Sequence, residues 1–253
     1  MIVLAPAKIN PFLAVGPPDE RGYHPLRTIF QAVGLYDEVE IEPGEGVEFV
    51  GQDVPPENTV TKALRLAYAL RPDISSVAVR VTKGIPSPGG LGGGSSDAAA
   101  VLKALSLTPE ERYEIARKVG ADVPFFLFGG RARGEGYGDL LTPLPDPEPH
   151  WLLLATPDVA CPTPEMYRRL DAIPREWRAW GDEPYNDFER VAPCECLELI
   201  DRLASFGAPA GLCGSGATVW GRFVSREATE KAAERIDAPF VAVVEALRVG
   251  RER

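Results

Sequence analysis

The chain has 253 residues, a formal net charge of −10 and 45% hydrophobic residues. That length can bury a substantial core and favours one or two domains. The acidic balance argues against a nucleic-acid-binding protein, which would normally present a basic face, but not against a small anionic ligand held by a few local donors. No apolar run approaches the roughly 18 residues of a membrane span, and the N-terminus lacks the pattern of a signal peptide. We therefore expect a cytoplasmic protein without membrane or nucleic-acid partners.

In chain order, strands are expected where β-branched and aromatic residues concentrate. These runs are Leu35–Ile41, Val77–Lys83, Trp151–Ala155, Thr218–Val224 and Phe240–Val244. Helices are expected between them, where capping and stop signals occur. The expected helices are Thr59–Arg71 after Asn58, a helix from Pro109 to Gly120 that opens with a Thr108–Glu111 capping box, Cys194–Phe206, and one after Ser225. Strands and helices mix without strict β–α–β alternation, which predicts an α+β fold.

A proline-rich stretch, Thr142–His150 (TPLPDPEPH), is the best candidate for a linker. It has little that can pack, and the segments before and after it are each of plausible domain size. We therefore predict an N-terminal domain over residues 1–146 and a C-terminal domain over residues 147–253, with a ligand site at their interface.

The four cysteines and two histidines show no recognisable zinc spacing. Cys194 and Cys196 form a C-x-C pair, which is too weak a pattern to indicate redox chemistry. We expect reduced cysteines and no zinc site built from these cysteines and histidines.

The strongest local pattern is the glycine-rich segment Ile85–Ala100, IPSPGGLGGGSSDAAA. It lies between a strand-like run and a helix-like run, Asp97–Leu105, which argues against a flexible linker. Successive backbone amides without side chains can surround an anion, and a helix N-terminus adds partial positive charge. Ser95 and Ser96 can cap the helix, donate to a phosphate or touch a metal. The segment fits neither the Walker A nor the dinucleotide-binding pattern, so it predicts a phosphate loop of another kind.

The segment PSPGGLGGGSSDAA resembles the ATP-binding motif of the GHMP kinases, which include galactokinase, homoserine kinase and mevalonate kinase. Further segments match this family in the same order along the chain. They are Ala5–Phe12 (APAKINPF), Arg21–Leu26 (RGYHPL) with Thr28, Gly120–Phe126 (GADVPFF), Asn186–Glu189 (NDFE) and Gly211–Gly221 (GLCGSGATVWG). The first two resemble the branch of the family that phosphorylates 4-diphosphocytidyl-2-C-methyl-D-erythritol.

The resemblance implies an N-terminal half like domain 2 of ribosomal protein S5, a ferredoxin-like C-terminal half, and an active site between them. It implies transfer of the γ-phosphoryl group of ATP, with Mg²⁺, to the 2-hydroxyl of 4-diphosphocytidyl-2-C-methyl-D-erythritol, a step of non-mevalonate isoprenoid biosynthesis. The partners would be ATP and this cytidine-diphosphate-linked alcohol. The implied ATP-binding residues are Pro86, Ser87, Pro88, Gly89, Gly90, Leu91, Gly92, Gly93, Gly94, Ser95 and Ser96.

One position departs from the family pattern. Pro88 stands where the family usually has glycine, and proline has no backbone N–H. We expect the loop to keep its course, because the other glycines remain. We also expect that the backbone at position 88 makes no hydrogen bond to a phosphate, either because that bond is lost or because it was never used. The sequence contains no acidic cluster that identifies a magnesium ligand. We expect ATP phosphates and water to hold most of the ion, with Ser95 or Ser96 as possible ligands.

The resemblance implies that Lys8 and Asp122 are catalytic. By local pattern alone, Asp122 is typical of a turn or cap, and Lys8 of a side chain that reaches the surface from an apolar run. Family position instead makes Asp122 the acceptor of the hydroxyl proton and places Lys8 beside it, where its charge would orient Asp122 and offset transition-state charge. Asn10 would lie near the substrate and, in a strand, on the same side as Lys8.

The implied cytosine-binding residues are Tyr23, by stacking, and His24, by hydrogen bonds to the base edge. The alternative for both is a loop pair whose bonds are satisfied within the protein. Tyr185 is a candidate second stacking residue. Asn58 fits either the adenine site or a helix cap, and Gly211–Gly221 either approaches the substrate diphosphate or packs the second domain.

Three alternative functions stay open. Another GHMP kinase would act on a different alcohol, such as mevalonate or homoserine, although the Arg21–Leu26 segment argues against this. A non-catalytic nucleotide-binding regulator would be expected to lack Lys8 or Asp122, and both are present. A nucleic-acid module on the S5-like fold would need a basic stripe, which the sequence lacks.

Overall fold

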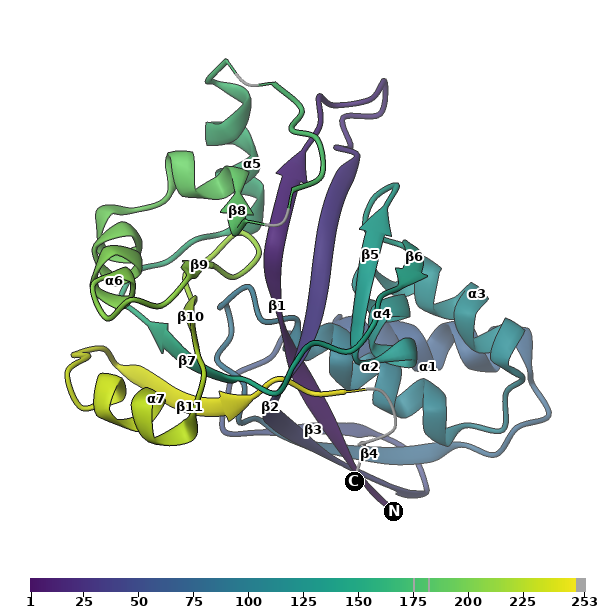
Figure 1. Ribbon diagram of the computed structural model, residues 1–253. Coiled ribbons are helices and arrows are strands. Elements are labelled where there is room, and N and C mark those ends of the chain that lie inside the picture. Colours follow the sequence, from purple (N-terminus) through teal and green to yellow (C-terminus); the bar gives the residue numbers. More distant parts are fainter. Residues whose placement is uncertain (175, 182, 249–253) are drawn as a thin grey trace.

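Two β-sheets with helices packed on them organise the chain in the computed structural model, which describes residues 1–174, 176–181 and 183–248 (Figure 1). The larger sheet has the order β3-β4-β2-β1-β8, and β5 and β6 continue it beside β2. Its strands are β1 (Ile2–Val15), β2 (Leu26–Pro43), β3 (Val47–Val50), β4 (Val77–Thr82), β5 (Arg131–Glu135), β6 (Leu140–Pro143) and β8 (Tyr185–Asn186). The long β1–β2 hairpin is the centre of this sheet.

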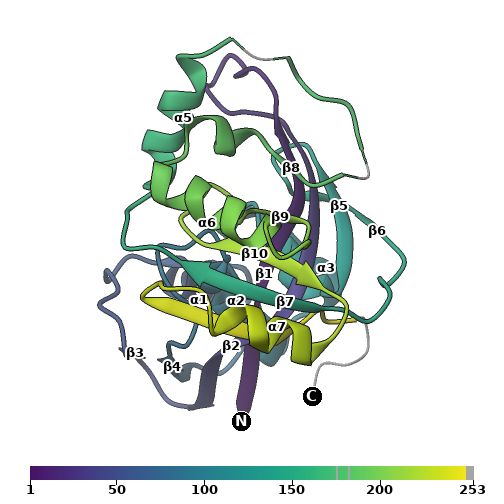
Figure 2. The same ribbon diagram turned by 60° about the vertical axis from the view of Figure 1, so that its left-hand side comes forward.

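The smaller sheet is antiparallel and has the order β11-β7-β10-β9. Its strands are β7 (Trp151–Thr156), β9 (Ala210–Leu212), β10 (Val219–Phe223) and β11 (Phe240–Glu245). In Figure 2 it lies beside the larger sheet, with α6 and α7 on its outer side. Together the two sheets and their helices confirm the α+β prediction.

Helices α1 to α4 cover one face of the larger sheet and share one apolar core with it. They are α1 (Thr59–Leu70), α2 (Gly93–Ala104), α3 (Pro109–Val119) and α4 (Val123–Phe128). The second half of the chain contributes α5 (Thr163–Asp171), the 3₁₀-helix η1 (Asp187–Val191), α6 (Cys194–Ala204) and α7 (Arg226–Ala233). Asn58 caps α1 and Thr108 caps α3, each in a capping box as predicted.

The alternation of side chains along β7 explains how the smaller sheet joins the rest of the molecule. Leu153 and Ala155 belong to the core shared with α5, α6 and α7, whereas Leu152 and Leu154 belong to a core shared with β1 and β2. Both faces of this sheet are therefore buried, which is why β7 is an almost continuous apolar run. The glycine-rich loop contributes Ile85 and Leu91 to the second of these cores.

Several elements were not predicted or are longer than predicted, and β1, β2 and α5 show why. β1 contains Pro6 and Pro11, which normally argue against a strand, and its pairing with β2 is irregular close to both prolines. β2 is an 18-residue strand of which only the second half was predicted. Helix α5 has no capping side chain, and its only start signals are Pro164 and Glu165 in the first turn, on which no prediction was based.

The proline-rich stretch begins within β6 and continues as coil to β7. The predicted domain boundary between residues 146 and 147 stays a prediction. The larger sheet contains strands from both sides of it, since β8 from the second half of the chain pairs with β1.

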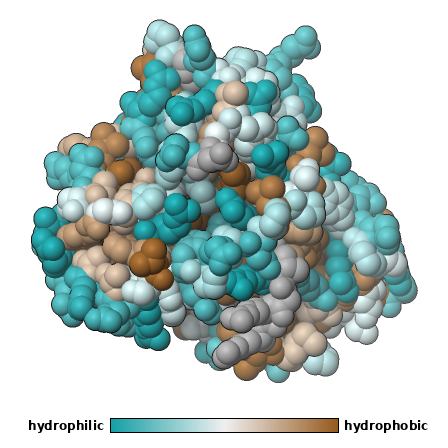
Figure 3. Space-filling view, viewed as in Figure 1, coloured by the Kyte–Doolittle hydropathy of each residue, from teal (hydrophilic) through white to brown (hydrophobic). Residues whose placement is uncertain are grey.

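On the face seen in Figure 3, hydrophilic residues predominate and hydrophobic ones form small separate groups. No helix within the described ranges is both long and apolar enough to cross a membrane.

Candidate active site

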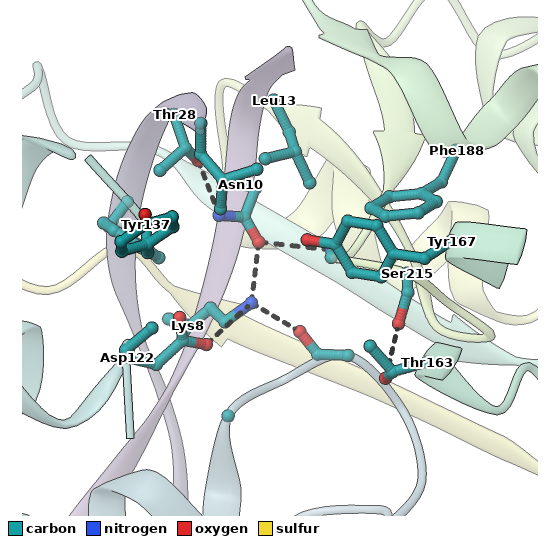
Figure 4. Close-up of a pocket in the computed structure, with 16 residues that line it drawn as sticks. Lys8, Asn10, Leu13, Thr28, Asp122, Tyr137, Thr163, Tyr167, Phe188 and Ser215 are labelled. Atoms are coloured by element: carbon teal, nitrogen blue, oxygen red, sulfur yellow. Dashed lines mark hydrogen bonds and ion pairs between the residues drawn. The ribbon is translucent and has the colours of Figure 1, made fainter. Parts of the chain in front are cut away.

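A cavity of about 300 Å³, here called the central cavity, lies where the first and second halves of the chain meet. Figure 4 shows side chains from β1, β2, the start of α4 and α5 pointing into it. Its lining residues are Lys8, Asn10, Leu13, Leu26, Thr28, Phe30, Gly90, Gly92, Ala121, Asp122, Tyr137, Thr163, Tyr167, Phe188, Gly214 and Ser215. The cavity therefore brings together segments that are far apart in the sequence, as expected for a site between two domains.

The glycine-rich loop runs from β4 into α2, and the helix begins earlier than predicted. α2 starts at Gly93, and its cap is Gly92, whose φ of +74° is in the left-handed region that favours glycine. The prediction that Ser95 or Ser96 caps this helix is wrong, because both lie inside its first turn. No side chain caps α2, so its first backbone amides lack a side-chain acceptor and are suited to an anion.

The two serines of the loop differ in burial. Ser95 is half-buried, whereas Ser96 is buried and its hydroxyl has no hydrogen-bond partner within the described residues. Of the two hydroxyls, that of Ser95 is therefore the better placed to reach a ligand outside the loop.

Pro88, the position that departs from the family pattern, is exposed and follows a cis peptide bond.

The Gly211–Gly221 segment packs directly on the glycine-rich loop. Gly90 has a φ of +72°, and a Cβ atom there would lie 1.9 Å from the carbonyl oxygen of Cys213. The amide of Thr218 also donates to the carbonyl of Gly89 at 3.3 Å. This contact places the second half of the chain against the loop and supports the packing role of the segment.

Lys8 is buried on β1, and its side chain lines the cavity (Figure 4). The ammonium donates to Oδ1 of Asn10 and to the carbonyl of Gly90, each at 2.7 Å. The amide of Asn10 donates to Thr28, and its oxygen also accepts from the amide of Gly214. Lys8 and Asn10 thus lie on one side of the strand, and the alternative in which Lys8 reaches the surface does not describe this side chain.

Asp122 immediately precedes α4 and directs its carboxylate to Lys8, with 3.6 Å between Oδ2 and Nζ. Its side chain is 32% exposed, while that of Lys8 is 5% exposed. The carboxylate makes no capping hydrogen bond with α4, although the residue occupies the cap position. The pair therefore presents a buried cation and a partly solvent-accessible carboxylate at one wall of the cavity.

Tyr23 and His24 do not line the central cavity. Tyr23 is 62% exposed, and its ring lies edge-on to that of Tyr137, which does line the cavity. Both ring nitrogens of His24 have protein partners, since Nδ1 lies 2.8 Å from the carbonyl of Gly16 and Nε2 lies 3.3 Å from Asp171. His24 thus agrees with the alternative interpretation, in which its hydrogen bonds are satisfied within the protein. A contact of Tyr23 or His24 with cytosine stays a prediction.

A hydrogen-bonded cluster connects the loop after β1 to the cavity wall. The Tyr137 hydroxyl donates to Asp19 at 2.6 Å, and Arg21 lies over the rings of both Tyr23 and Tyr137. The hydrogen bond from Tyr137 lowers the pKa of Asp19 and raises that of Tyr137 itself. Tyr137 is thereby held in place as part of the wall.

Two other candidates lie away from the central cavity. Tyr185 packs against Phe12 and donates to Asp187, and burial raises the pKa of its hydroxyl to about 12. Asn58 uses its side-chain oxygen to cap α1 by accepting from Val60 and Thr61. The cap is thus confirmed, and a contact of Asn58 with adenine stays a prediction.

Several cavity residues were not singled out from the sequence. Thr163 and Tyr167 are on α5, which had no capping signal, and Tyr137 is in the β5–β6 turn. By contrast, Phe188, Gly214 and Ser215 lie in the NDFE and GLCGSGATVWG segments that the sequence did mark. Thr163 and Ser215 share a hydrogen bond of 2.9 Å between their hydroxyls.

Known proteins resemble this chain over most of its length. Residues 58–130 match the GHMP kinases N-terminal domain. The 4-diphosphocytidyl-2-C-methyl-D-erythritol kinase of Geobacter metallireducens is 37% identical over 96% of this chain and 97% of its own length. The protein of the same name from Anaeromyxobacter is 39% identical over 92% of this chain and 85% of its own length.

Solved structures show the same fold. A crystal structure of 4-(cytidine 5'-diphospho)-2C-methyl-D-erythritol kinase superposes with a TM-score of 0.81 and 31% identity, covering 98% of this chain and 100% of the other. Homoserine kinase from Cytophaga hutchinsonii has a TM-score of 0.72 at 17% identity, covering 98% of this chain and 94% of its own, which shows the fold alone. The GHMP kinase fold is thus confirmed, and the chain belongs to the 4-diphosphocytidyl-2-C-methyl-D-erythritol kinase family.

Proposed function

We propose that this protein is an ATP-dependent kinase that transfers the γ-phosphoryl group to the 2-hydroxyl of 4-diphosphocytidyl-2-C-methyl-D-erythritol. The observation that carries the catalytic part of this proposal is the Lys8–Asp122 pair, 3.6 Å apart, in a cavity that also reaches Gly90 and Gly92 of the glycine-rich loop. The glycine-rich loop, the Lys8 ammonium and the Asp122 carboxylate thus meet in one cavity. These are the parts that phosphoryl transfer requires for alignment and charge compensation.

The glycine-rich loop is the proposed triphosphate site. The first amides of α2 have no capping side chain, and the N-terminal end of the helix carries partial positive charge. The Ser95 hydroxyl adds a further donor in the same turn. This binding mode needs no positively charged surface, which fits the acidic balance of the chain.

Asp122 is the proposed acceptor of the hydroxyl proton. As the substrate oxygen bonds to the γ-phosphorus, the bond from that phosphorus to the bridging oxygen of ADP breaks, and the hydroxyl proton passes to the carboxylate. The exposed part of Asp122 faces the cavity in which this hydroxyl would lie. Its carboxylate is not used as a helix cap and is free for this role.

Lys8 is proposed to orient the reacting groups and offset charge. An ammonium has three N–H donors, and Lys8 gives two of them to Asn10 and Gly90. The remaining donor side faces Asp122, where an alcohol or phosphoryl oxygen between the two groups would be in reach of both. Its bond to Gly90 also ties the position of this charge to the loop that would hold ATP.

Mg²⁺ is the metal that the family implies. The described residues hold no group of three or more His, Cys, Asp or Glu side chains that could bind a metal ion. A hydroxyl oxygen is nevertheless a suitable Mg²⁺ ligand, and the half-buried Ser95 offers one at the start of α2. We propose that Ser95, ATP phosphates and water hold the ion, which would neutralise phosphate charge during transfer.

The test is ADP release by the purified protein with ATP, Mg²⁺ and one of four alcohols: 4-diphosphocytidyl-2-C-methyl-D-erythritol, mevalonate, homoserine or galactose. Of the four alcohols, only 4-diphosphocytidyl-2-C-methyl-D-erythritol, from here on called the cytidylyl alcohol, should give ADP release above background. Phosphorus NMR of the product should show a new phosphate monoester next to an intact diphosphate. Faster release with another alcohol, or no release with any of them, would refute the proposed function.

A further inference from the structure

A fully buried cluster of three charged side chains lies beneath the glycine-rich loop. Asp37 comes from β2, Lys83 follows β4, and Asp97 is on α2. Their side chains are 0%, 4% and 1% exposed. The Lys83 ammonium donates to Oδ2 of Asp97 at 2.7 Å and makes a second, shorter contact with Oδ2 of Asp37. One cation thus bridges two carboxylates from different elements.

Asp37 also holds the first residues of the loop. Its second oxygen accepts from the amides of Gly84 and Ile85 at 2.7 and 2.9 Å. The start of α2 lies against the same carboxylate, because a Cβ atom at Gly93 would be 3.1 Å from Oδ2 of Asp37. The entry to the loop and the helix that leaves it are therefore fixed at one point.

The composition of this cluster is unfavourable for stability alone. Two carboxylates and one ammonium are removed from water together, and Oδ1 of Asp97 has no hydrogen-bond partner within the described residues. Burial raises the pKa of Asp97 to about 7, an effect that Lys83 opposes and Asp37 increases. Buried ion clusters often stabilise a protein no better than apolar residues of similar volume, so this geometry suits a role in positioning.

We propose that Lys83, through Asp37 and Asp97, is a positioning residue that fixes both ends of the glycine-rich loop and holds the first amides of α2 in place before ATP binds. The inference rests on the proposed role of this loop as the triphosphate site. Lys83 would not touch the reacting atoms. It would act on nucleotide affinity, because a loop whose ends are free must be ordered when ATP binds.

The experiment measures KM for ATP and for the cytidylyl alcohol, together with ATP affinity by calorimetry, in four variants. Lys83→Met removes the bridge. Asp97→Asn keeps an oxygen acceptor for Lys83 and removes the charge. Asp37→Asn cannot accept from the Gly84 and Ile85 amides and from Lys83 at once, because one of its two side-chain atoms is a donor. Val101→Ala weakens the buried core face of α2 without touching the cluster and controls for lost stability.

We expect Lys83→Met to raise KM and Kd for ATP by about tenfold or more, with KM for the alcohol within about twofold of wild type. Asp97→Asn should stay within about threefold of wild type for both substrates. If Lys83→Met does not fold, Asp37→Asn should show the same selective loss for ATP. Val101→Ala should lower the melting temperature and leave both KM values unchanged.

The inference would be overturned if folded Lys83→Met or Asp37→Asn had the ATP affinity of the wild type. It would also be overturned if these variants and Val101→Ala all lost affinity equally for ATP and for the alcohol. A wild-type protein that binds ATP but phosphorylates none of the alcohols would refute the proposed function alone, and calorimetry would still test the cluster. A wild-type protein that does not bind ATP would refute both.

Discussion

Lys8 shows how one buried side chain can connect three segments that the sequence places far apart. Its ammonium contacts Asn10 on the same strand, Gly90 in the glycine-rich loop and Asp122 before α4. The amide of Asn10 in turn fixes Thr28 on the neighbouring strand. Because two hydrogen bonds and one ion pair hold the Lys8 ammonium, its position is determined by the fold and needs no bound ligand.

The carboxylate of Asp122 is expected to matter for turnover and little for folding. Asp122→Asn should lower kcat by roughly 10²–10⁴ and leave KM for ATP and the melting temperature nearly unchanged, because the side chain is part-exposed and caps no helix. Steady-state kinetics and thermal melts check this. Asp201→Asn on the exposed side of α6 is the matched control and should behave as wild type. Near-normal turnover of Asp122→Asn would rule out its role as the proton acceptor.

Asp97 is expected to make stability depend on pH. Burial raises its pKa from 3.8 to about 7, so the folded state holds this proton more tightly than the unfolded state does. Its stabilising contribution is complete at low pH and is lost as the pH rises through about 7. The free energy of unfolding of the wild type should therefore fall relative to that of Asp97→Asn between about pH 4 and pH 7 and run parallel to it above that range. Urea denaturation at several pH values measures it, and curves that are parallel throughout would contradict the expectation.

Among the elements, local signals predicted those whose ends are marked by their own residues. Helices α1 and α3 have capping boxes, and both are found at the predicted positions. β1 and α5 were missed because their structure depends on tertiary contacts. The prolines of β1 lie near irregular positions of its pairing with β2, and α5 lacks a cap. The same holds for the site. The sequence motifs predicted the glycine-rich loop, Lys8 and Asp122, whereas Tyr137 and Tyr167 lie in no motif and are brought to the cavity by the fold.

The contact between the glycine-rich loop and the Gly211–Gly221 segment gives a test at this scale. Gly90 and Gly22 both have positive φ, of +72° and +81°, so alanine is strained at either position. Only at Gly90 would the new Cβ meet a backbone atom, at 1.9 Å, while Gly22 has nothing within 4 Å. Gly90→Ala should therefore reduce the free energy of unfolding by about 1–3 kcal/mol more than Gly22→Ala. Chemical denaturation compares the two, and equal losses would argue against this contact.

Across the whole molecule, the two halves of the chain are connected through the larger sheet. β8 pairs with β1, and Asp187, which follows it, accepts from the amide of Val15 at 2.7 Å. Beyond β11 the chain returns to β2, where Leu247 donates to Ala32 and accepts from the Gln31 side chain. The central cavity lies between these connections, so its two walls are held together by backbone pairing as well as by side chains.

This arrangement predicts that the two halves unfold together. Differential scanning calorimetry should give one transition whose calorimetric and van't Hoff enthalpies agree. Asp187→Ala should lower the temperature of that single transition, because it removes the buried acceptor of the Val15 amide. Two resolved transitions in the wild type would show that the halves are independent units.

The arrangement of loop, ammonium and carboxylate is tested most directly by a crystal structure with a non-hydrolysable ATP analogue and the cytidylyl alcohol. The γ-phosphate should lie at the first turn of α2, with the 2-hydroxyl within hydrogen-bond distance of both Asp122 and Lys8. A triphosphate bound away from Gly89–Ser95, or a 2-hydroxyl out of reach of Asp122, would contradict the mechanism proposed for this protein.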